Sequence, residues 1–138
     1  MLDHPAIPFV ARLLMVYIYL TSGIAKVASW PDNVTYMERH HIPMVPVLLA
    51  AAAVIELGGS LCLILGWQAR IAAFIMFVYT TVVTVMLHNY WALPAEARGM
   101  QETHFRKNLA IMGGLLLLSW CGPGRWSVGR DRSRLSAG

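Results

Sequence analysis

Four apolar segments follow one another along the 138-residue chain, separated by connections that contain prolines, histidines and charged residues. A helix that rises about 1.5 Å per residue needs about 20 apolar residues to cross the hydrocarbon core of a membrane. The sequence therefore predicts an all-α membrane protein, a four-transmembrane-helix bundle that forms a single domain over residues 1–138. The expected spans and the basic tail cover residues 7–28, 47–65, 69–88, 107–121 and 122–138.

The second span contains one charged residue, Glu56, within the stretch VLLAAAAVIELGGSLCLIL. An ionised carboxylate near the bilayer midplane costs about 2.5–3.5 kcal/mol on insertion scales, so such a residue is a functional candidate by default. Ala52, Gly59 and Leu63 share its helical face, and small residues there allow a partner helix to approach closely. We expect this face to point into the bundle. The alternative is a protonated Glu56 that only joins two helices through a hydrogen bond.

The first and third spans carry polar stripes at helical spacing. The first stripe is Arg12, Met15, Tyr19, Ser22 and Lys26, and the third span presents Phe77, Thr81, Thr84 and His88. We expect Arg12 to extend to the nearby interface, as long basic side chains do at helix ends, and Lys26 to point inward. His88 precedes Asn89, Tyr90 and Trp91, which are typical of an interfacial belt.

The fourth apolar run is short. Leu109 to Cys121 covers about 20 Å of helix against a hydrocarbon core of about 30 Å, so polar residues before it should be drawn in. The candidates are His104, Arg106, Lys107 and Asn108, after a connection over residues 91–103. Gly59 in the second span and Gly113 in the fourth are expected at helix contacts.

Composition agrees with a membrane protein and excludes other classes. The chain is 57% hydrophobic and 13% charged, whereas soluble domains carry about 25% charged residues. The positive-inside rule accounts for the net charge of +4, and nucleic-acid binding is not expected. Arg70 and the arginines of the tail lie on one side of the bundle if it has four spans. We therefore expect both termini in the cytoplasm, with Lys26, His88 and Lys107 at the outer, periplasmic end.

Metal and thiol chemistry have weak sequence support. His40 and His41 are adjacent, so they do not face the same side of a helix, and we interpret them as a loop pair. Cys62 and Cys121 form no CxxC motif and are interpreted as packing residues. The sequence predicts no metal site.

Several motifs occur in an order that resembles the DoxX family over nearly the whole chain. They are ARLLMVYIYLTSGIAK at residues 11–26, ELGGSLCLILGWQARIAA from Glu56, HNYW from His88, HFRKNLAIMGGLLLL from His104 and GPGRWSVGRD from Gly122. The resemblance implies a four-helix bundle in the bacterial inner membrane. It also implies a link to oxidoreductase systems, including thiosulfate:quinone oxidoreductase subunits. Lys26, Glu56, His88, Lys107 and Asn108 fall within these motifs.

These observations lead to a functional hypothesis, a membrane subunit of an oxidoreductase that binds a quinone in a polar cavity in the outer half of the bundle. Glu56, His88 and Lys107 are the expected catalytic residues, and Tyr19, Lys26, Trp91 and Asn108 are expected to contact the quinone. The expected partners are membrane lipid, a redox subunit and further copies of the chain. One alternative is a non-catalytic anchor or assembly subunit. Another is a small anion or metal carrier, which would need to oligomerise.

Overall fold

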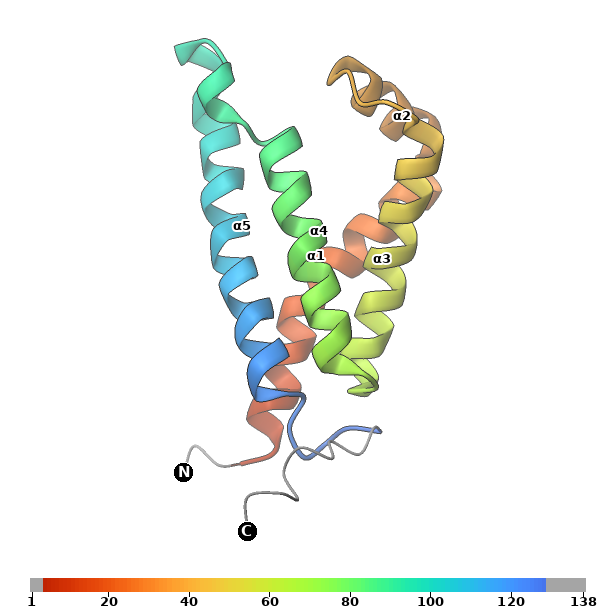
Figure 1. Ribbon diagram of the computed structural model, residues 1–138, viewed down its shortest axis with the longest axis vertical. Coiled ribbons are helices and arrows are strands. Elements are labelled where there is room, and N and C mark those ends of the chain that lie inside the picture. The colour runs from red at the N-terminus through yellow and green to blue at the C-terminus, as the bar shows by residue number, and fades with distance from the viewer. Residues whose placement is uncertain (1–3, 129–138) are drawn as a thin grey trace.

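A computed structural model describes residues 4–128, which contain helices and no strand. Four long helices alternate in direction along the bundle, as Figure 1 shows. They are α1 (Ala6–Ala28), α3 (Val45–Leu65), α4 (Ala69–Leu87) and α5 (Ala95–Cys121). The shorter α2 (Trp30–Arg39) and η1 (Tyr90–Ala92) lie in the two connections at the end of the bundle that is distant from the α3–α4 turn.

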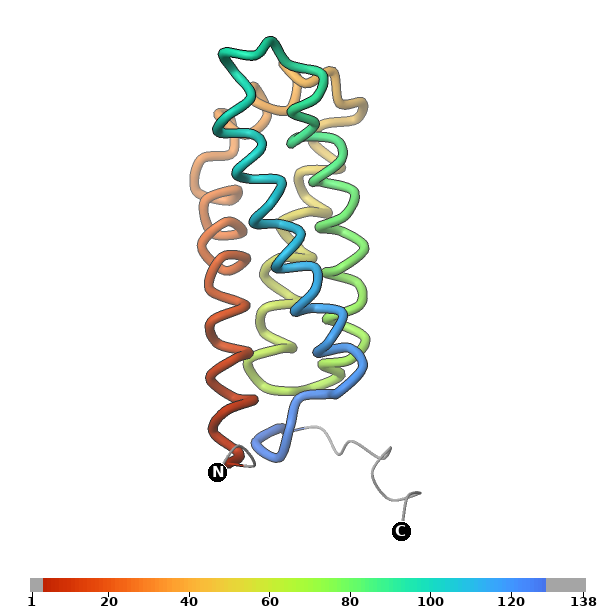
Figure 2. Tube along the Cα trace, turned by 90° about the vertical axis from the view of Figure 1, so that its left-hand side faces the viewer, coloured from red at the N-terminus to blue at the C-terminus, as the bar shows by residue number. Residues whose placement is uncertain are grey.

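The long helices pack mainly as sequential neighbours. The most extensive contacts join α1 with α3, α4 with α5, and α3 with α4, whereas α1 and α5 touch over a short stretch. Figure 2 shows α5 crossing the face of the bundle beside α1. In Figure 1, α3 and α4 are close at the turn around Gly66 and diverge towards the opposite end. One end of the bundle is therefore tightly packed and the other is wider.

Three helices are long and apolar enough to cross a membrane, over Ala6–Ala28, Val45–Leu65 and Ala69–Ala92. They correspond to the first three predicted spans. The helix α5 begins at Ala95, so the expected connection over residues 91–103 was wrong. Residues 95–106 are rich in strong helix formers, and Arg106 pairs with Glu102 one turn earlier at 2.6 Å. The fourth apolar run is thus the second half of a longer helix.

Two arginines join neighbouring helices at the narrow end of the bundle. The guanidinium of Arg12 donates to the carbonyl oxygen of Leu63 at 2.8 Å and to that of Trp126. Arg70 donates to the carbonyl oxygens of Trp120 and, at 3.2 Å, Cys121. The last carbonyls of a helix lack partners within it, so these arginines satisfy the C-termini of α3 and α5.

Arg12 is therefore not an interfacial side chain. Only 1% of its surface is exposed, and the expectation that it extends to the nearby interface was wrong. The unpaired carbonyls at the end of α3 lie within its reach and offer better partners than lipid headgroups.

The expected glycine contacts were confirmed at one position and wrong at the other. A Cβ atom on Gly59 would lie 2.5 Å from Sδ of Met76, so α3 and α4 approach closely there. A Cβ atom on Gly113 would meet nothing within 4 Å. The neighbouring Gly114 faces the Met15 side chain of α1 instead. Adjacent residues on a helix point about 100° apart, so the glycine pair could not both face the bundle.

The polar stripe of α4 is also rotated relative to the expectation. Thr80 and Thr84 are buried, whereas Thr81 is half-buried and donates to the carbonyl oxygen of Phe77 in its own helix. The inward face includes Ala72, Met76, Thr80 and Thr84, which repeat every four residues.

We expect Gly59→Leu to destabilise the protein and Gly113→Leu to have little effect. A leucine at position 59 must displace Met76, and overpacking of this kind costs about 1–3 kcal/mol. At position 113 the added side chain meets open space and gains helix propensity. Thermal unfolding in detergent micelles measures both variants. Equal stability of the two variants would contradict this account of the α3–α4 contact.

Candidate functional site

A cavity of about 480 Å³ opens in the wider half of the bundle. Side chains of α1, α2, α3, α4 and α5 all contribute to its wall. Most of the lining is apolar. The polar and titratable lining residues are Tyr19, Ser22, Lys26, Tyr36, Glu56, Tyr79, Thr80, His88, His104 and Asn108.

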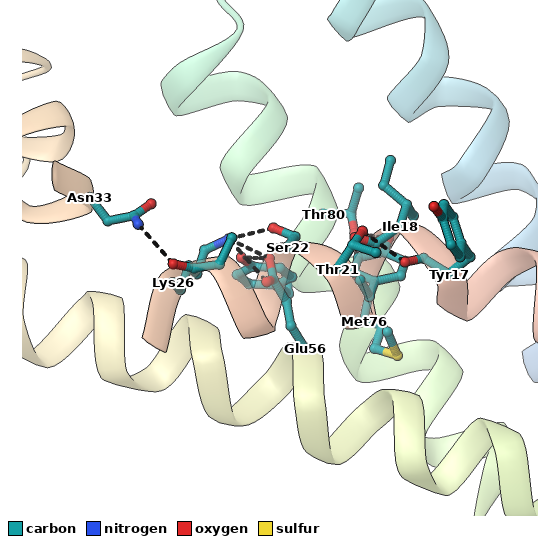
Figure 3. Close-up of polar contacts among 12 residues, drawn as sticks. Tyr17, Ile18, Thr21, Ser22, Lys26, Asn33, Glu56, Met76 and Thr80 are labelled. Carbon is teal, nitrogen blue, oxygen red and sulfur yellow. Dashed lines mark hydrogen bonds and ion pairs between the residues drawn. The ribbon is translucent and has the colours of Figure 1, made fainter. Parts of the chain in front are cut away.

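A hydrogen-bonded ion pair lies in the wall formed by α1 and α3. Nζ of Lys26 is 2.9 Å from both Oε1 and Oε2 of Glu56, and it donates to Oγ of Ser22 at 2.6 Å. The hydroxyl of Tyr79 donates to Oε1 of Glu56 at 2.6 Å. Figure 3 shows Lys26 reaching towards Ser22 and Glu56. The side chain of Glu56 is only 5% exposed, so this pair is nearly removed from solvent.

Local sequence explains why α1 and α3 come so close at this point. A Cβ atom on Gly23 would lie 2.9 Å from the side chain of Leu57 and 3.2 Å from Cβ of Glu56. Any larger residue there would push the helices apart. Ser22 and Lys26 are one helical turn apart, so both face Glu56. The small residue at position 23 thus brings the lysine and the carboxylate within hydrogen-bond distance.

The opposite wall, formed by α4 and α5, carries a second polar group. Asn108 donates from Nδ2 to Oγ1 of Thr84 at 2.9 Å, and Nδ1 of His88 is 2.8 Å from Oε1 of Gln101. The rings of His88 and His104 stack with centroids 5.2 Å apart. Burial, together with the charge of Lys107 and His88, lowers the pKa of His104 and favours its neutral form.

The cavity contains five of the seven residues proposed from the sequence. Those that line it are Tyr19, Lys26, Glu56, His88 and Asn108. The phenol of Tyr19 forms a hydrogen bond with Thr80. Sequence reasoning therefore brought residues from four different helices to one site, and their roles in binding or catalysis stay a prediction.

Two of the proposed residues lie elsewhere. Lys107 is exposed on α5 and does not line the cavity, so the expectation that it joins Glu56 and His88 there was wrong. The ion-pair partner of Glu56 is Lys26. Because Asn108 faces the cavity, the preceding residue points away from it. Trp91 is 52% exposed and packs edge-on against Phe105, with ring centroids 5.6 Å apart, instead of lining the cavity.

Tyr79 and Thr80 were missed by the sequence reasoning. Their signal is weak, because a tyrosine and a run of threonines in an apolar helix are also common packing residues. Within residues 4–128, no group of three or more histidine, cysteine, aspartate or glutamate side chains is arranged to hold a metal ion. Both Cys62 and Cys121 are free thiols, and neither lines the cavity.

Comparison with known proteins identifies the family. The model of the DoxX family matches residues 7–89 of this chain. The chain belongs to the DoxX family. This DoxX protein is 32% identical to the inner membrane protein YphA of Escherichia coli, over 92% of this chain and 91% of YphA. The inner membrane protein YqjF of Escherichia coli is also 32% identical, over 88% of each chain.

A more distant relative comes from yeast. The ER-derived vesicles protein ERV29 of Saccharomyces cerevisiae is 32% identical over 87% of this chain, which corresponds to 32% of ERV29. No solved structure matches the chain. The DoxX protein is thus a membrane protein, and the two bacterial relatives support a place in the inner membrane.

We expect Lys26→Met and Glu56→Gln each to destabilise the DoxX protein by about 3–5 kcal/mol, the usual loss when one partner of a buried ion pair is removed. The double variant should lose less than the sum, with a coupling of about 0.5–3 kcal/mol. Thermal and chemical unfolding in detergent micelles measure the stability of the wild type, the two single variants and the double variant.

The matched control is Lys107→Met, which removes an exposed lysine and should change stability by no more than about 0.5 kcal/mol. Additive losses for Lys26→Met and Glu56→Gln would show that the two side chains do not interact in the folded protein.

Proposed function

We propose that this DoxX protein is an integral membrane subunit of an oxidoreductase system and that it binds a quinone in its cavity. The observation that carries the proposal is the Lys26–Glu56–Tyr79 cluster within an otherwise largely apolar cavity of about 480 Å³. Small-molecule sites typically have volumes of about 300–1,000 Å³ and combine apolar walls with a few polar groups. A quinone head group needs both features.

The walls of the cavity favour a ligand that comes from the lipid phase. Leu48 on α3 and Val82 and Met86 on α4 line the cavity and are also 40–50% exposed. The start of α3 and the end of α4, which contain these residues, diverge in Figure 1. An apolar tail placed between them would stay in contact with lipid. The arrangement therefore supports a quinone over the small anion or metal ion that a carrier would bind.

The lining residues provide functions that quinone chemistry requires. A quinone takes up protons together with electrons when it is reduced. Glu56 can hold a proton beside the ring, and the stacked His88 and His104 line the same cavity. Tyr19 offers an aromatic wall for packing. Because neither free cysteine lines the cavity, electrons are expected from a partner subunit or a soluble reductant.

We further propose four membrane spans with both termini in the cytoplasm, the apolar half of α5 over residues 107–121 forming the fourth span. This part of α5 packs along α4, and the start of α1 and the end of α5 lie at the same end of the bundle in Figure 1. Arg12, Arg70 and Arg125 are at that end, whereas Arg39, Arg98, Arg106 and Lys107 are at the other. The excess of basic residues that the positive-inside rule expects at a cytoplasmic face therefore depends on the arginines of the tail. The tail arginines at positions 130, 132 and 134 lie outside the described residues.

We expect the purified protein in lipid nanodiscs to bind a short-tailed ubiquinone or menaquinone. Both Glu56→Gln and Lys26→Met should weaken binding by about tenfold or more, because each removes one partner of the ion pair that forms the polar wall of the cavity. Quenching of intrinsic fluorescence measures affinity, and mass spectrometry of extracted lipid tests for native quinone. Lys107→Met is the control and should bind as the wild type does. Absence of saturable binding would favour the anchor hypothesis.

Reporter fusions test the proposed topology. At Gly138, a reporter that works only in the cytoplasm should be active. At residues 92–94, a reporter that works only in the periplasm should be active. The four-span arrangement puts one span between the two fusion points and therefore places them on opposite sides of the membrane. The same result at both positions would contradict it.

A further inference from the structure

The polar lining of the cavity is exposed at the wider end of the bundle and buried at depth. Tyr36 on α2 is 40% exposed, the side chain of Lys26 near the end of α1 is 19% exposed, and that of Glu56 is 5% exposed. Since α3 begins at Val45, Glu56 lies about 16 Å along it from the wider end. This gradient indicates that water enters the cavity at the wider end and that Glu56 is close to the floor of the cavity.

The floor of the cavity satisfies its own hydroxyl protons. Thr80 donates to the carbonyl oxygen of Met76 in its own helix at 2.7 Å, so the phenol of Tyr19 donates to Thr80. The hydroxyl proton of Tyr79 goes to Glu56 at 2.6 Å. These hydroxyl groups therefore have no proton left to donate towards the narrow end of the bundle.

An apolar layer follows the floor in the direction of the narrow end. Its members are no more than 2% exposed, pack in one cluster, come from all four long helices and do not line the cavity. They are Val16, Leu63, Ala73, Met76 and Leu115. Met76 lies one helical turn from Thr80 on the side of the narrow end, so the layer begins directly beyond the floor. Closely packed apolar side chains offer water neither room nor hydrogen-bond partners, and they form a barrier to water and protons.

One polar side chain lies within this layer. Ser60 is one turn beyond Glu56 on α3, it is fully buried, and its Oγ has no hydrogen-bond partner within residues 4–128. A buried water molecule needs about two to four polar partners, which a lone hydroxyl does not provide. Beyond the layer, the guanidinium of Arg12 is engaged by carbonyl oxygens of distant segments, and its Nε is buried without a partner in the described residues. The described side chains thus form no continuous polar path from Glu56 to the narrow end.

We propose that water reaches the Lys26–Glu56 pair from the wider end alone, and that the apolar layer closes the site towards the narrow end. A ligand bound beside Glu56 then exchanges protons only with the side of the membrane that the wider end faces. The identity of the ligand as a quinone rests on the proposed function, whereas the one-sided access rests on the cavity and the layer. With both termini in the cytoplasm, as proposed above, a quinone reduced at this site takes its protons from the periplasm, while its electrons come from the partner subunit or soluble reductant.

Cysteine labelling tests the access of water without any ligand. The two native thiols are first replaced, by Cys62→Ala and Cys121→Ser, since neither lines the cavity. One probe is then placed in the cavity wall, Ala52→Cys, and another in the apolar layer, Ala73→Cys. A membrane-impermeant methanethiosulfonate reagent is applied to spheroplasts, which present the periplasmic side, and to inverted vesicles, which present the cytoplasmic side.

Two exposed positions mark the ends of the bundle, Ala92→Cys at the wider end and Trp67→Cys in the α3–α4 turn. Ala52→Cys should react in the same preparation as Ala92→Cys and stay unlabelled where Trp67→Cys reacts, because a thiol must meet water to ionise and react. Ala73→Cys should stay unlabelled in both preparations. The markers make the comparison independent of which end of the bundle is cytoplasmic.

The outcomes separate this inference from the proposed function. Labelling of Ala52→Cys from the narrow-end side, from both sides or from neither would overturn the inference. Ala52→Cys adds a single sulfur atom to a cavity wall, so it decides the question even if Ala73→Cys fails to fold. A short-tailed ubiquinone that binds in the cavity should slow the labelling of Ala52→Cys. One-sided labelling that the ubiquinone leaves unchanged would support the one-sided access and contradict the quinone site.

Discussion

The buried ion pair between Lys26 and Glu56 is the interaction on which the rest of the site depends. Either charge alone would be costly inside an apolar bundle, and the pair is tolerated because Ser22 and Tyr79 complete its hydrogen bonds. The pair joins α1 to α3, and the hydrogen bond from Tyr79 to Glu56 connects α4 to the same cluster. It needs a close approach of α1 and α3, which Gly23 provides. A local steric feature of one helix thus sets the position of the charged group in the cavity.

The two ends of the bundle have different physical roles. At the narrow end, Arg12 and Arg70 each satisfy the C-terminus of the next long helix, α3 and α5 respectively. At the wider end, each of the same helix pairs holds a polar contact, Lys26 with Glu56 and Asn108 with Thr84. The arginines hold the helices together at the narrow end, so the cavity can stay open in the wider half of the bundle. The two halves share this arrangement although the sequence shows no clear internal repeat.

Family membership alone does not fix the activity, because one fold can carry several functions. Proteins of Escherichia coli and yeast are similar in sequence to this chain, and their names state no activity. The cavity supports the proposed quinone ligand, because it combines apolar walls with a cluster whose charges neutralise each other. A neutral, amphipathic ligand fits such a site better than an ion, since an ion would disturb the pairing of Lys26 with Glu56.

The sequence alone determined the helical class, three of the spans and the inward position of Glu56, because apolar length and the cost of a charge in lipid act along a single helix. The partner of Glu56 is a relation between helices. Lys26 and Lys107 were both suitable by charge, and only the rotation of α5 and the close approach of α1 and α3 at Gly23 decided between them. For the same reason Arg12 could not be placed in advance, since the carbonyls that it satisfies belong to distant segments. Helix rotation and mutual packing are tertiary properties, and they selected the residues that form the site.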